Sequence, residues 1–139
     1  IQFKDAFILI HKVKMMDGKN GPQQIQGEWD FPKGGVKKND VDLRVALLRE
    51  LAEETGSTRY EIIKEFSEKI CFSFPLNIQA KIGYTHQETT MFLVNYIGTL
   101  DQLSPTDEEI DSIKAFTKEE VLQQLAHEDS REFFKKQVI

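Results

Sequence analysis

Residues 49–56 read Arg49-Glu50-Leu51-Ala52-Glu53-Glu54-Thr55-Gly56, and upstream of them residues 31–35 read Phe31-Pro32-Lys33-Gly34-Gly35. If residues 49–56 are helical, Glu50, Glu53 and Glu54 lie within an arc of about 100° on the helix surface. Carboxylates placed so closely repel one another unless a cation lies among them. Their oxygens suit Mg²⁺ or Mn²⁺, which keep open positions for water and phosphate oxygens. The spacing therefore predicts a metal-dependent phosphate chemistry, with a solvated acidic helix face as the alternative.

The same residues resemble the signature of the Nudix (MutT-like) hydrolases. That signature runs Gly, five residues, Glu, seven residues, and then Arg-Glu-apolar-x-Glu-Glu-x-Gly-apolar. Gly35 stands at the first glycine, and the second half is matched in register from Arg49 to Gly56. Because this spacing is long and asymmetric, we expect residues 1–139 to form a single Nudix hydrolase domain.

Two positions depart from the signature. Val41 stands where the first Glu is expected, between Asp40 and Asp42, and Ser57 replaces the final apolar residue. The change at Val41 removes one ligand or one contact at the start of the helix. Either neighbouring aspartate can substitute if the loop is shifted by a residue. Because the three later carboxylates are intact, we expect reduced or retuned activity rather than none.

The resemblance implies an α/β fold, in which an α/β/α sandwich is built around a mixed β-sheet. It also implies that Glu50, Glu53 and Glu54 hold Mg²⁺, with Mn²⁺ as an alternative. In this family the metal polarises a bridging phosphate and activates a water for in-line attack on phosphorus. We therefore expect a hydrolase that acts on phosphorus-containing acid anhydrides.

Three residues are candidates for catalytic roles, namely Glu53, Arg49 and Glu109. Arg49 precedes Glu53 by four residues, and the resemblance suggests that it orients a catalytic carboxylate, whereas the alternative is an ordinary surface ion pair. Residues 109–116 resemble the segment in which many Nudix enzymes place a glutamate as metal ligand or general base. Glu108 is the neighbouring alternative for that role, and a solvated acidic loop is the other.

Four residues are candidates for substrate binding. Lys33 lies in a Pro-Lys-Gly-Gly turn and is expected to contact phosphate, unless it is simply solvated. Gly34 and Gly35 give the turn unhindered backbone amides beside the helix. Tyr84 is a candidate for stacking on a base, although a tyrosine in this position is often part of the core.

The composition limits the partners that we expect. The chain has 139 residues, 40% of them hydrophobic and 29% charged, with a net charge of −5. This charge argues against broad nucleic-acid binding. Cys71 excludes an internal disulfide and lies in an apolar run, so we expect a buried thiol and, without a visible signal peptide, a cytoplasmic location. No apolar run is long enough to span a membrane.

The residue patterns also predict the secondary structure. We expect the apolar stripes on both sides of the helix to be sandwiched between layers. The other apolar runs predict strands, and the polar segments between them predict loops. The expected elements are strands over 6–13, 29–31, 60–66, 68–74, 78–84, 90–98 and 110–116, a polar loop over 16–27, a hairpin tip at 86–88, and helices over 42–56, 118–126 and 128–136.

We expect the substrate to be a nucleoside diphosphate linked to another moiety. The Phe-Pro-Lys-Gly turn most resembles that of the dinucleoside polyphosphate hydrolases. The alternatives are hydrolysis of an RNA 5′-triphosphate, nucleoside triphosphate house-cleaning, and a catalytically silent module that senses a nucleotide. The expected partner is a nucleotide-type small molecule, or the 5′ end of an RNA, bound by a monomer or a homodimer.

Overall fold

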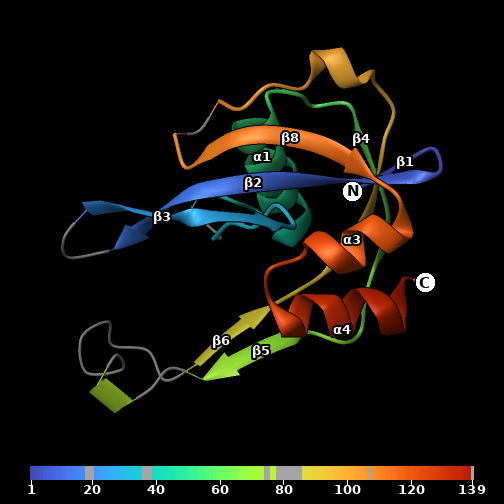
Figure 1. Cartoon of the computed structure of the whole chain (residues 1–139). Helices are drawn as coiled ribbons and strands as arrows, with labels where there is room; N and C mark the ends of the chain where they lie inside the picture. Colours follow the sequence, from blue (N-terminus) through green and yellow to red (C-terminus); the bar gives the residue numbers. More distant parts are fainter. Residues whose placement is uncertain (18–20, 36–38, 74–75, 78–85, 107, 139) are drawn as a thin grey trace.

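The computed structural model describes residues 1–17, 21–35, 39–73, 76–77, 86–106 and 108–138. Within these residues, six strands form a mixed sheet in the order β3-β2-β1-β7-β4, with β8 paired to β2 (Figure 1). The pair β1–β7 is parallel, and the remaining pairs of this sheet are antiparallel. The strands are β1 (Gln2–Phe3), β2 (Ala6–Asp17), β3 (Gly21–Asp30), β4 (Tyr60–Glu65), β7 (Phe92–Tyr96) and β8 (Ile110–Phe116).

Helices cover both faces of this sheet. Neighbouring residues of a strand point to opposite faces, so Ile8 of β2 packs with Leu51 of α1 (Leu43–Thr55), and Phe7 packs on the other side. There Phe7 meets α3 (Lys118–Gln124) and α4 (Glu128–Gln137). The predicted α/β/α sandwich with a mixed sheet is therefore confirmed. None of the helices in the described part of the chain is long and apolar enough to cross a membrane.

Helix α1 begins and ends where its capping residues predict. The side chain of Asp42 accepts a hydrogen bond of 2.9 Å from the Val45 amide, which is otherwise one of the unpaired groups of the first turn. Gly56 ends the helix with φ at 72°, a left-handed conformation that glycine adopts without a steric penalty. These two residues fix the length of the element that carries the carboxylates.

The prediction that α1 is sandwiched between layers is wrong. Leu51 is buried against the sheet, whereas Val45 and Leu48 are 43% and 38% exposed. The helix forms the outer layer of the sandwich, so only one of its two apolar stripes faces the sheet. The second stripe faces outward along the helix surface.

The predicted loop over 16–27 is also wrong, because β2 continues to Asp17 and β3 begins at Gly21. The two strands pair from Lys14 to Asp17 with the segment from Gly21 to Gln24, and this pairing uses backbone groups whatever the side chains are. The remaining predicted strands and helices agree with the structure to within a few residues, except at the segment discussed next.

The segment at 86–88 is strand rather than hairpin tip. Strand β6 (His86–Thr89) pairs with β5 (Ile70–Ser73) in a separate two-stranded sheet. Cys71 lies on this ribbon and is exposed, which contradicts the predicted buried thiol. The physical reason is strand alternation: Ile70 faces inward and its neighbour faces outward. The predicted strand over 78–84 lies outside the described residues.

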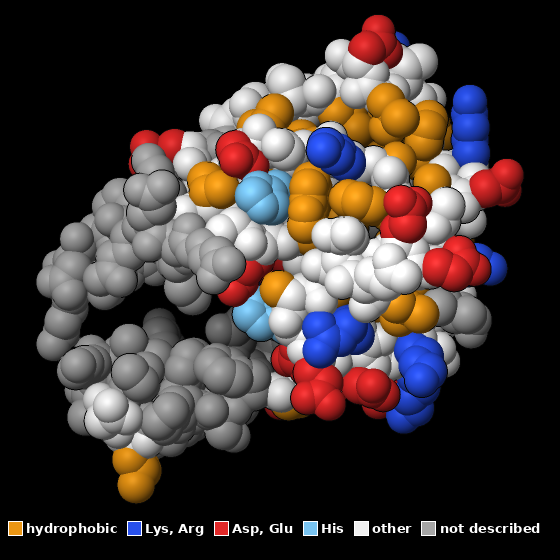
Figure 2. All heavy atoms as spheres, viewed as in Figure 1, with side chains coloured by type: hydrophobic (Ala, Val, Ile, Leu, Met, Phe, Trp, Pro, Cys, Tyr) orange, Lys and Arg blue, Asp and Glu red, His pale blue; other side chains and the backbone are white. Residues whose placement is uncertain are grey.

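The visible surface mixes charges of both signs. Acidic and basic side chains are interspersed over the face of the molecule that Figure 2 presents. Two of the ion pairs between separate elements are Lys136 with Glu68 at 3.2 Å and Lys69 with Glu88 at 3.8 Å. This distribution agrees with the modest net charge of −5.

Candidate functional site

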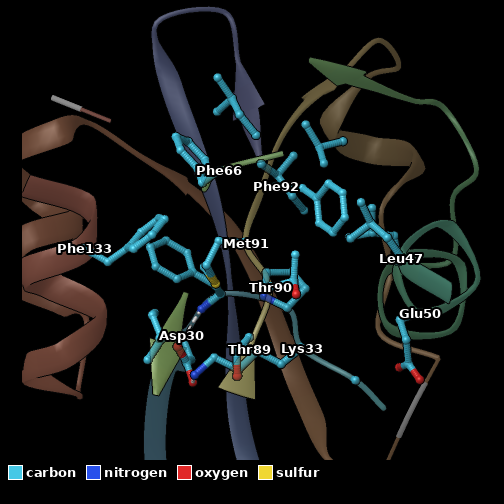
Figure 3. Close-up of a pocket in the computed structure, with 18 of the residues that line it drawn as sticks. Asp30, Lys33, Leu47, Glu50, Phe66, Thr89, Thr90, Met91, Phe92 and Phe133 are labelled. Carbon is cyan, nitrogen blue, oxygen red and sulfur yellow. Dashed lines mark hydrogen bonds and ion pairs between the residues drawn. The ribbon is translucent and has the colours of Figure 1, made fainter. Parts of the chain in front are cut away.

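A cavity of about 870 Å³ opens between α1, the turn that follows β3, strand β7 and helix α4. Figure 3 shows apolar side chains on one side of it, including Phe66, Met91 and Phe133. Asp30 and Lys33 lie on its opposite side. The cavity therefore offers one apolar wall and one polar wall to a ligand, which is a common division in small-molecule sites.

The turn after β3 supplies Lys33, a candidate for phosphate contact, to this cavity. Its ammonium lies 3.4 Å from a carboxylate oxygen of Asp30, whose side chain is only 5% exposed. Lys33 itself is 26% exposed, so it is anchored at one side and open to the cavity at the other. Asp30, the last residue of β3, was not predicted as a site residue.

Gly34 and Gly35 follow in the same turn and have different contacts. A Cβ atom on Gly34 would overlap the carboxyl group of Glu50, so the backbone of the turn approaches this side chain more closely than any other residue permits. No atom of the described residues, chain neighbours apart, lies within 4 Å of the equivalent position on Gly35. The carbonyl of Gly35 instead accepts a hydrogen bond of 2.8 Å from Nη2 of Arg49.

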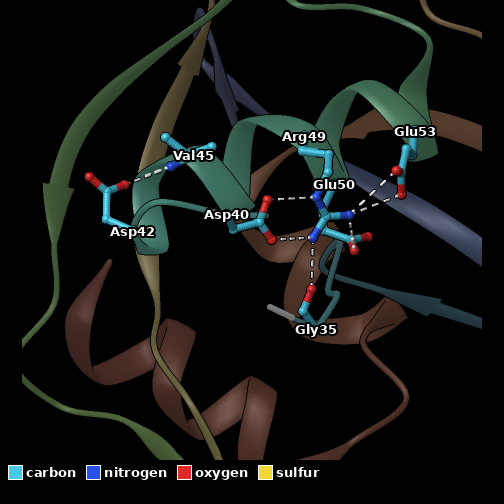
Figure 4. Close-up of polar contacts among 7 residues, drawn as sticks. All are labelled: Gly35, Asp40, Asp42, Val45, Arg49, Glu50 and Glu53. Atoms are coloured by element: carbon cyan, nitrogen blue, oxygen red, sulfur yellow. Dashed lines mark hydrogen bonds and ion pairs between the residues drawn. The ribbon is translucent and has the colours of Figure 1, made fainter. Parts of the chain in front are cut away.

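Arg49 is the centre of the polar network on α1 (Figure 4). Its Nε and Nη2 donate to the two carboxylate oxygens of Asp40 at 3.0 and 2.8 Å. Its Nη1 donates to Glu50 at 2.8 Å and to Glu53 at 3.3 Å. The hydrogen bonds to Asp40, and then those to Glu50, raise the pKa of the Arg49 guanidinium further above its already high value. The guanidinium therefore remains a cation throughout the pH range in which proteins are folded.

The contacts of Asp40 and Asp42 explain the departure at Val41. Val41 is 87% exposed. Asp40, with a side chain that is 4% exposed, contacts the arginine, and Asp42 caps the helix. Asp42 thus makes the contact at the helix start, and Asp40, the other neighbour, pairs with Arg49.

The three glutamates of α1 occupy three different environments. The side chain of Glu50 is 17% exposed and that of Glu53 is 44% exposed, and both face Arg49. Glu54 is buried at 5% exposure on the inner side of the helix. Among the described residues, no group of three or more His, Cys, Asp or Glu side chains is arranged to hold a metal ion. In this arrangement the Arg49 cation lies between two of the three carboxylates, those of Glu50 and Glu53.

The donor type still fits a divalent cation. Two carboxylates converge on a single nitrogen of Arg49, so a positive charge is already accommodated at this point of the helix. Carboxylate oxygens are the ligands that Mg²⁺ and Mn²⁺ prefer. These residues are chemically suited to such an ion, provided that Glu50 and Glu53 turn from the arginine toward it.

The remaining predicted residues divide into two groups. Glu109 is half-buried and lines the cavity with Glu50 and Lys33, although it is distant from both in sequence. Glu53 is not among the residues that line the cavity. Tyr84 lies outside the described residues. Sequence reasoning missed the apolar wall from α4, because only the tertiary fold brings Phe133 into this cavity.

Comparisons with known proteins agree with this architecture. A family model described as NUDIX domain matches residues 4–137. An RNA pyrophosphohydrolase of Acidiphilium cryptum is 37% identical over 78 residues, which are 55% of this chain and 47% of that protein. One from Nitratiruptor is 42% identical over 71 residues, which are 50% of this chain and 45% of that protein. The aligned region thus spans about half the length of these relatives.

A solved structure supports the fold independently. The Escherichia coli dihydroneopterin triphosphate pyrophosphohydrolase superposes with a TM-score of 0.66, covering 97% of this chain and 86% of that one. The sequence identity is 13%, so this likeness concerns the fold alone.

Proposed function

The chain belongs to the Nudix family, and from this premise we propose that it is a divalent-metal-dependent pyrophosphohydrolase that acts on the 5′-triphosphorylated end of an RNA. The observation that carries the proposal is the cavity that Lys33, Glu50 and Glu109 line together. Relatives named RNA pyrophosphohydrolase support the choice of substrate. The net charge of −5 limits recognition to the phosphorylated end rather than to the length of the RNA.

Glu50, Glu53 and Glu54 would hold Mg²⁺, with Mn²⁺ as an alternative. The bound ion would supply a Lewis acid for phosphate oxygens, which the negative chain lacks. Arg49 would keep Glu50 and Glu53 close to the position of the ion, since it donates to both of them while Asp40 and Gly35 accept from its other nitrogens. Mutation of such positioning groups commonly lowers metal affinity or activity by about 10- to 100-fold.

The reaction requires a water to attack phosphorus while a pyrophosphate leaves. We assign Lys33 to a phosphate oxygen of the substrate, because its ammonium lies at the polar wall of the cavity. We assign Glu109 to accept the proton of the attacking water. The P–O bond to the leaving pyrophosphate then breaks and leaves a 5′-monophosphate on the RNA. Positioning and charge stabilisation suffice for such a transfer, because little covalent work falls on the protein.

A dinucleoside polyphosphate is the second candidate substrate. The apolar wall of the cavity includes Phe66, Phe92 and Phe133 (Figure 3), and aromatic side chains bind the faces of nucleobases favourably. A small ligand with a base at each end of its phosphate chain would use both the polar and the apolar wall. The first nucleotide of an RNA would use them in the same way.

A substrate panel tests the proposal. Triphosphorylated RNA, diadenosine tetraphosphate, nucleoside triphosphates and nucleotide sugars are each incubated with Mg²⁺ in the presence or absence of EDTA, and the products are identified. We expect pyrophosphate from the RNA and no reaction in EDTA. Turnover of diadenosine tetraphosphate alone would select the second candidate. No turnover of any substrate, with nucleotide-dependent thermal stabilisation, would overturn catalysis in favour of a nucleotide sensor.

A further inference from the structure

We propose that Asp30 is a positioning residue that holds the ammonium of Lys33 in place for the phosphate chain of the substrate. The inference rests on the proposed function, because it concerns the same cavity. Asp30 is the last residue of β3, where its backbone pairs with Ile10 of the central strand. Its backbone is therefore held by strand pairing within the sheet.

The carboxylate of Asp30 is bonded on both of its oxygens. One oxygen accepts a hydrogen bond of 2.8 Å from the Phe31 amide, and the other lies 3.4 Å from the Lys33 ammonium. A carboxylate with a 5% exposed side chain is costly to bury unless it is paired and hydrogen-bonded. Asp30 thus fixes the backbone of the turn with one oxygen and its cation with the other.

The turn between the two residues is itself constrained. Pro32 fixes one backbone dihedral between them. The Phe31 ring lies 6.2 Å from the ring of Phe134, centroid to centroid. A free lysine would lose the freedom of several rotatable bonds on binding phosphate. Because Asp30 already restricts Lys33, less of that loss falls on the binding step.

The charges around the cavity indicate why this placement matters. Its described lining contains five carboxylate residues but only two lysines. The carboxylates are Asp30, Glu50, Glu88, Glu109 and Asp129, and the lysines are Lys12 and Lys33. A polyphosphate entering a wall with this excess of negative charge depends on each cation being well placed. Asp30→Asn keeps an oxygen that can accept the hydrogen bond from the Phe31 amide, but it removes the negative charge that attracts Lys33.

A double-mutant cycle tests the coupling. Asp30→Asn, Lys33→Met and the double variant are compared for kcat and KM on triphosphorylated RNA, and for binding of inorganic pyrophosphate by calorimetry with Mg²⁺. When Lys33 is present, we expect Asp30→Asn to raise KM about tenfold and to weaken pyrophosphate affinity about tenfold. In the Lys33→Met background, Asp30→Asn should change each quantity by less than about twofold. The effect on kcat should stay small. Glu68→Gln, which breaks the ion pair with Lys136 outside this cavity, is the matched control and should change neither quantity.

An equal effect of Asp30→Asn in both backgrounds would overturn the inference, because it would indicate a purely structural role. Asp30→Glu keeps the charge but moves it by one methylene, and its cycle with Lys33→Met applies the same criterion if the Asn variant does not fold. Failure of the proposed function can be distinguished from failure of this inference. In that case no substrate is turned over, while pyrophosphate binding still shows the coupling of Asp30 with Lys33 or excludes it.

Discussion

Arg49 determines where two of the carboxylates on α1 point. Its nitrogens contact Asp40, Gly35, Glu50 and Glu53, so residues from the loop before the helix and from its outer face meet at one guanidinium. The planar fork of arginine allows this geometry, which a lysine ammonium could not reproduce. The charge of Arg49 also offsets the repulsion that the spacing of the glutamates creates in the sequence.

Substitutions at Asp40 and Val41 should therefore differ in their effect on turnover. Asp40→Asn weakens both hydrogen bonds to the arginine, and we expect turnover to fall about 10- to 100-fold. Val41→Glu restores the family residue, but the 87% exposed position lies apart from the arginine contact that Asp40 already makes, so activity should stay within about twofold. Steady-state kinetics with Mg²⁺ measures both. A large gain from Val41→Glu would contradict the assignment of Asp40.

The two glycines of the turn provide a second matched pair. Gly34→Ala places a Cβ atom in the carboxyl group of Glu50, which must turn away, so kcat should fall about tenfold or more while the protein stays folded. Gly35→Ala adds a methyl group that meets none of the described residues within 4 Å, chain neighbours apart, and should change activity little. The measurements are kcat for both variants and their thermal unfolding. Equal activity of the two variants would exclude a role for the placement of Glu50.

At the scale of the element, α1 depends on its N-terminal cap. Asp42→Ala removes the acceptor for the Val45 amide, and the free energy of unfolding should fall by about 1 kcal/mol. Asp42→Asn keeps an acceptor and should retain most of the stability. Urea denaturation compares the two variants. If they lose the same amount, the cap hydrogen bond does not stabilise the helix.

The same helix illustrates what the sequence could predict and what it could not. Its ends follow from local chemistry, the aspartate cap and the left-handed glycine, so both were predicted correctly. The exposure of Val45 and Leu48 was not, because a second apolar stripe does not reveal whether another layer covers it. The prediction of a loop over 16–27 was wrong because side-chain character alone does not determine backbone pairing. Backbone pairing between β2 and β3 extends the hairpin although its side chains resemble those of a loop.

At the scale of the whole molecule, α4 is tied to the turn before β5 by an ion pair. Hydrogen bonds from Lys136, and then from Gln137, hold the pKa of the Glu68 carboxyl below its ordinary value. The unfolded state then binds more protons than the folded state at acidic pH, so stability rises with pH. This contribution is present above the unfolded-state pKa of about 4 and is lost as pH falls through the lower folded-state pKa.

Glu68→Gln should therefore destabilise the protein slightly at neutral pH, and this difference should shrink as pH falls and the wild-type Glu68 becomes protonated. Denaturation midpoints of the two proteins at several pH values measure the difference. A difference that is independent of pH would mean that the charge of Glu68 does not stabilise the docking of α4.

The candidate site was predictable only in part. Local spacing selected Arg49, Lys33 and the glutamates of α1 as candidates, because these lie within one short segment of sequence. The cavity could not be derived in the same way, since Glu109 and Phe133 reach it from distant parts of the chain. The structure also shows two contacts that the spacing did not predict. Gly34 makes room for Glu50, and Asp30, which carried no signature, fixes Lys33.

The most direct test of the account is the turnover of 5′-triphosphorylated RNA by the wild type and by Glu53→Gln, with and without EDTA. The account predicts that the wild type releases pyrophosphate only when Mg²⁺ is available. It also predicts that Glu53→Gln loses several orders of magnitude in kcat while its thermal unfolding is unchanged. Turnover that persists in EDTA, or near-wild-type activity of the variant, would contradict a metal-dependent site on α1.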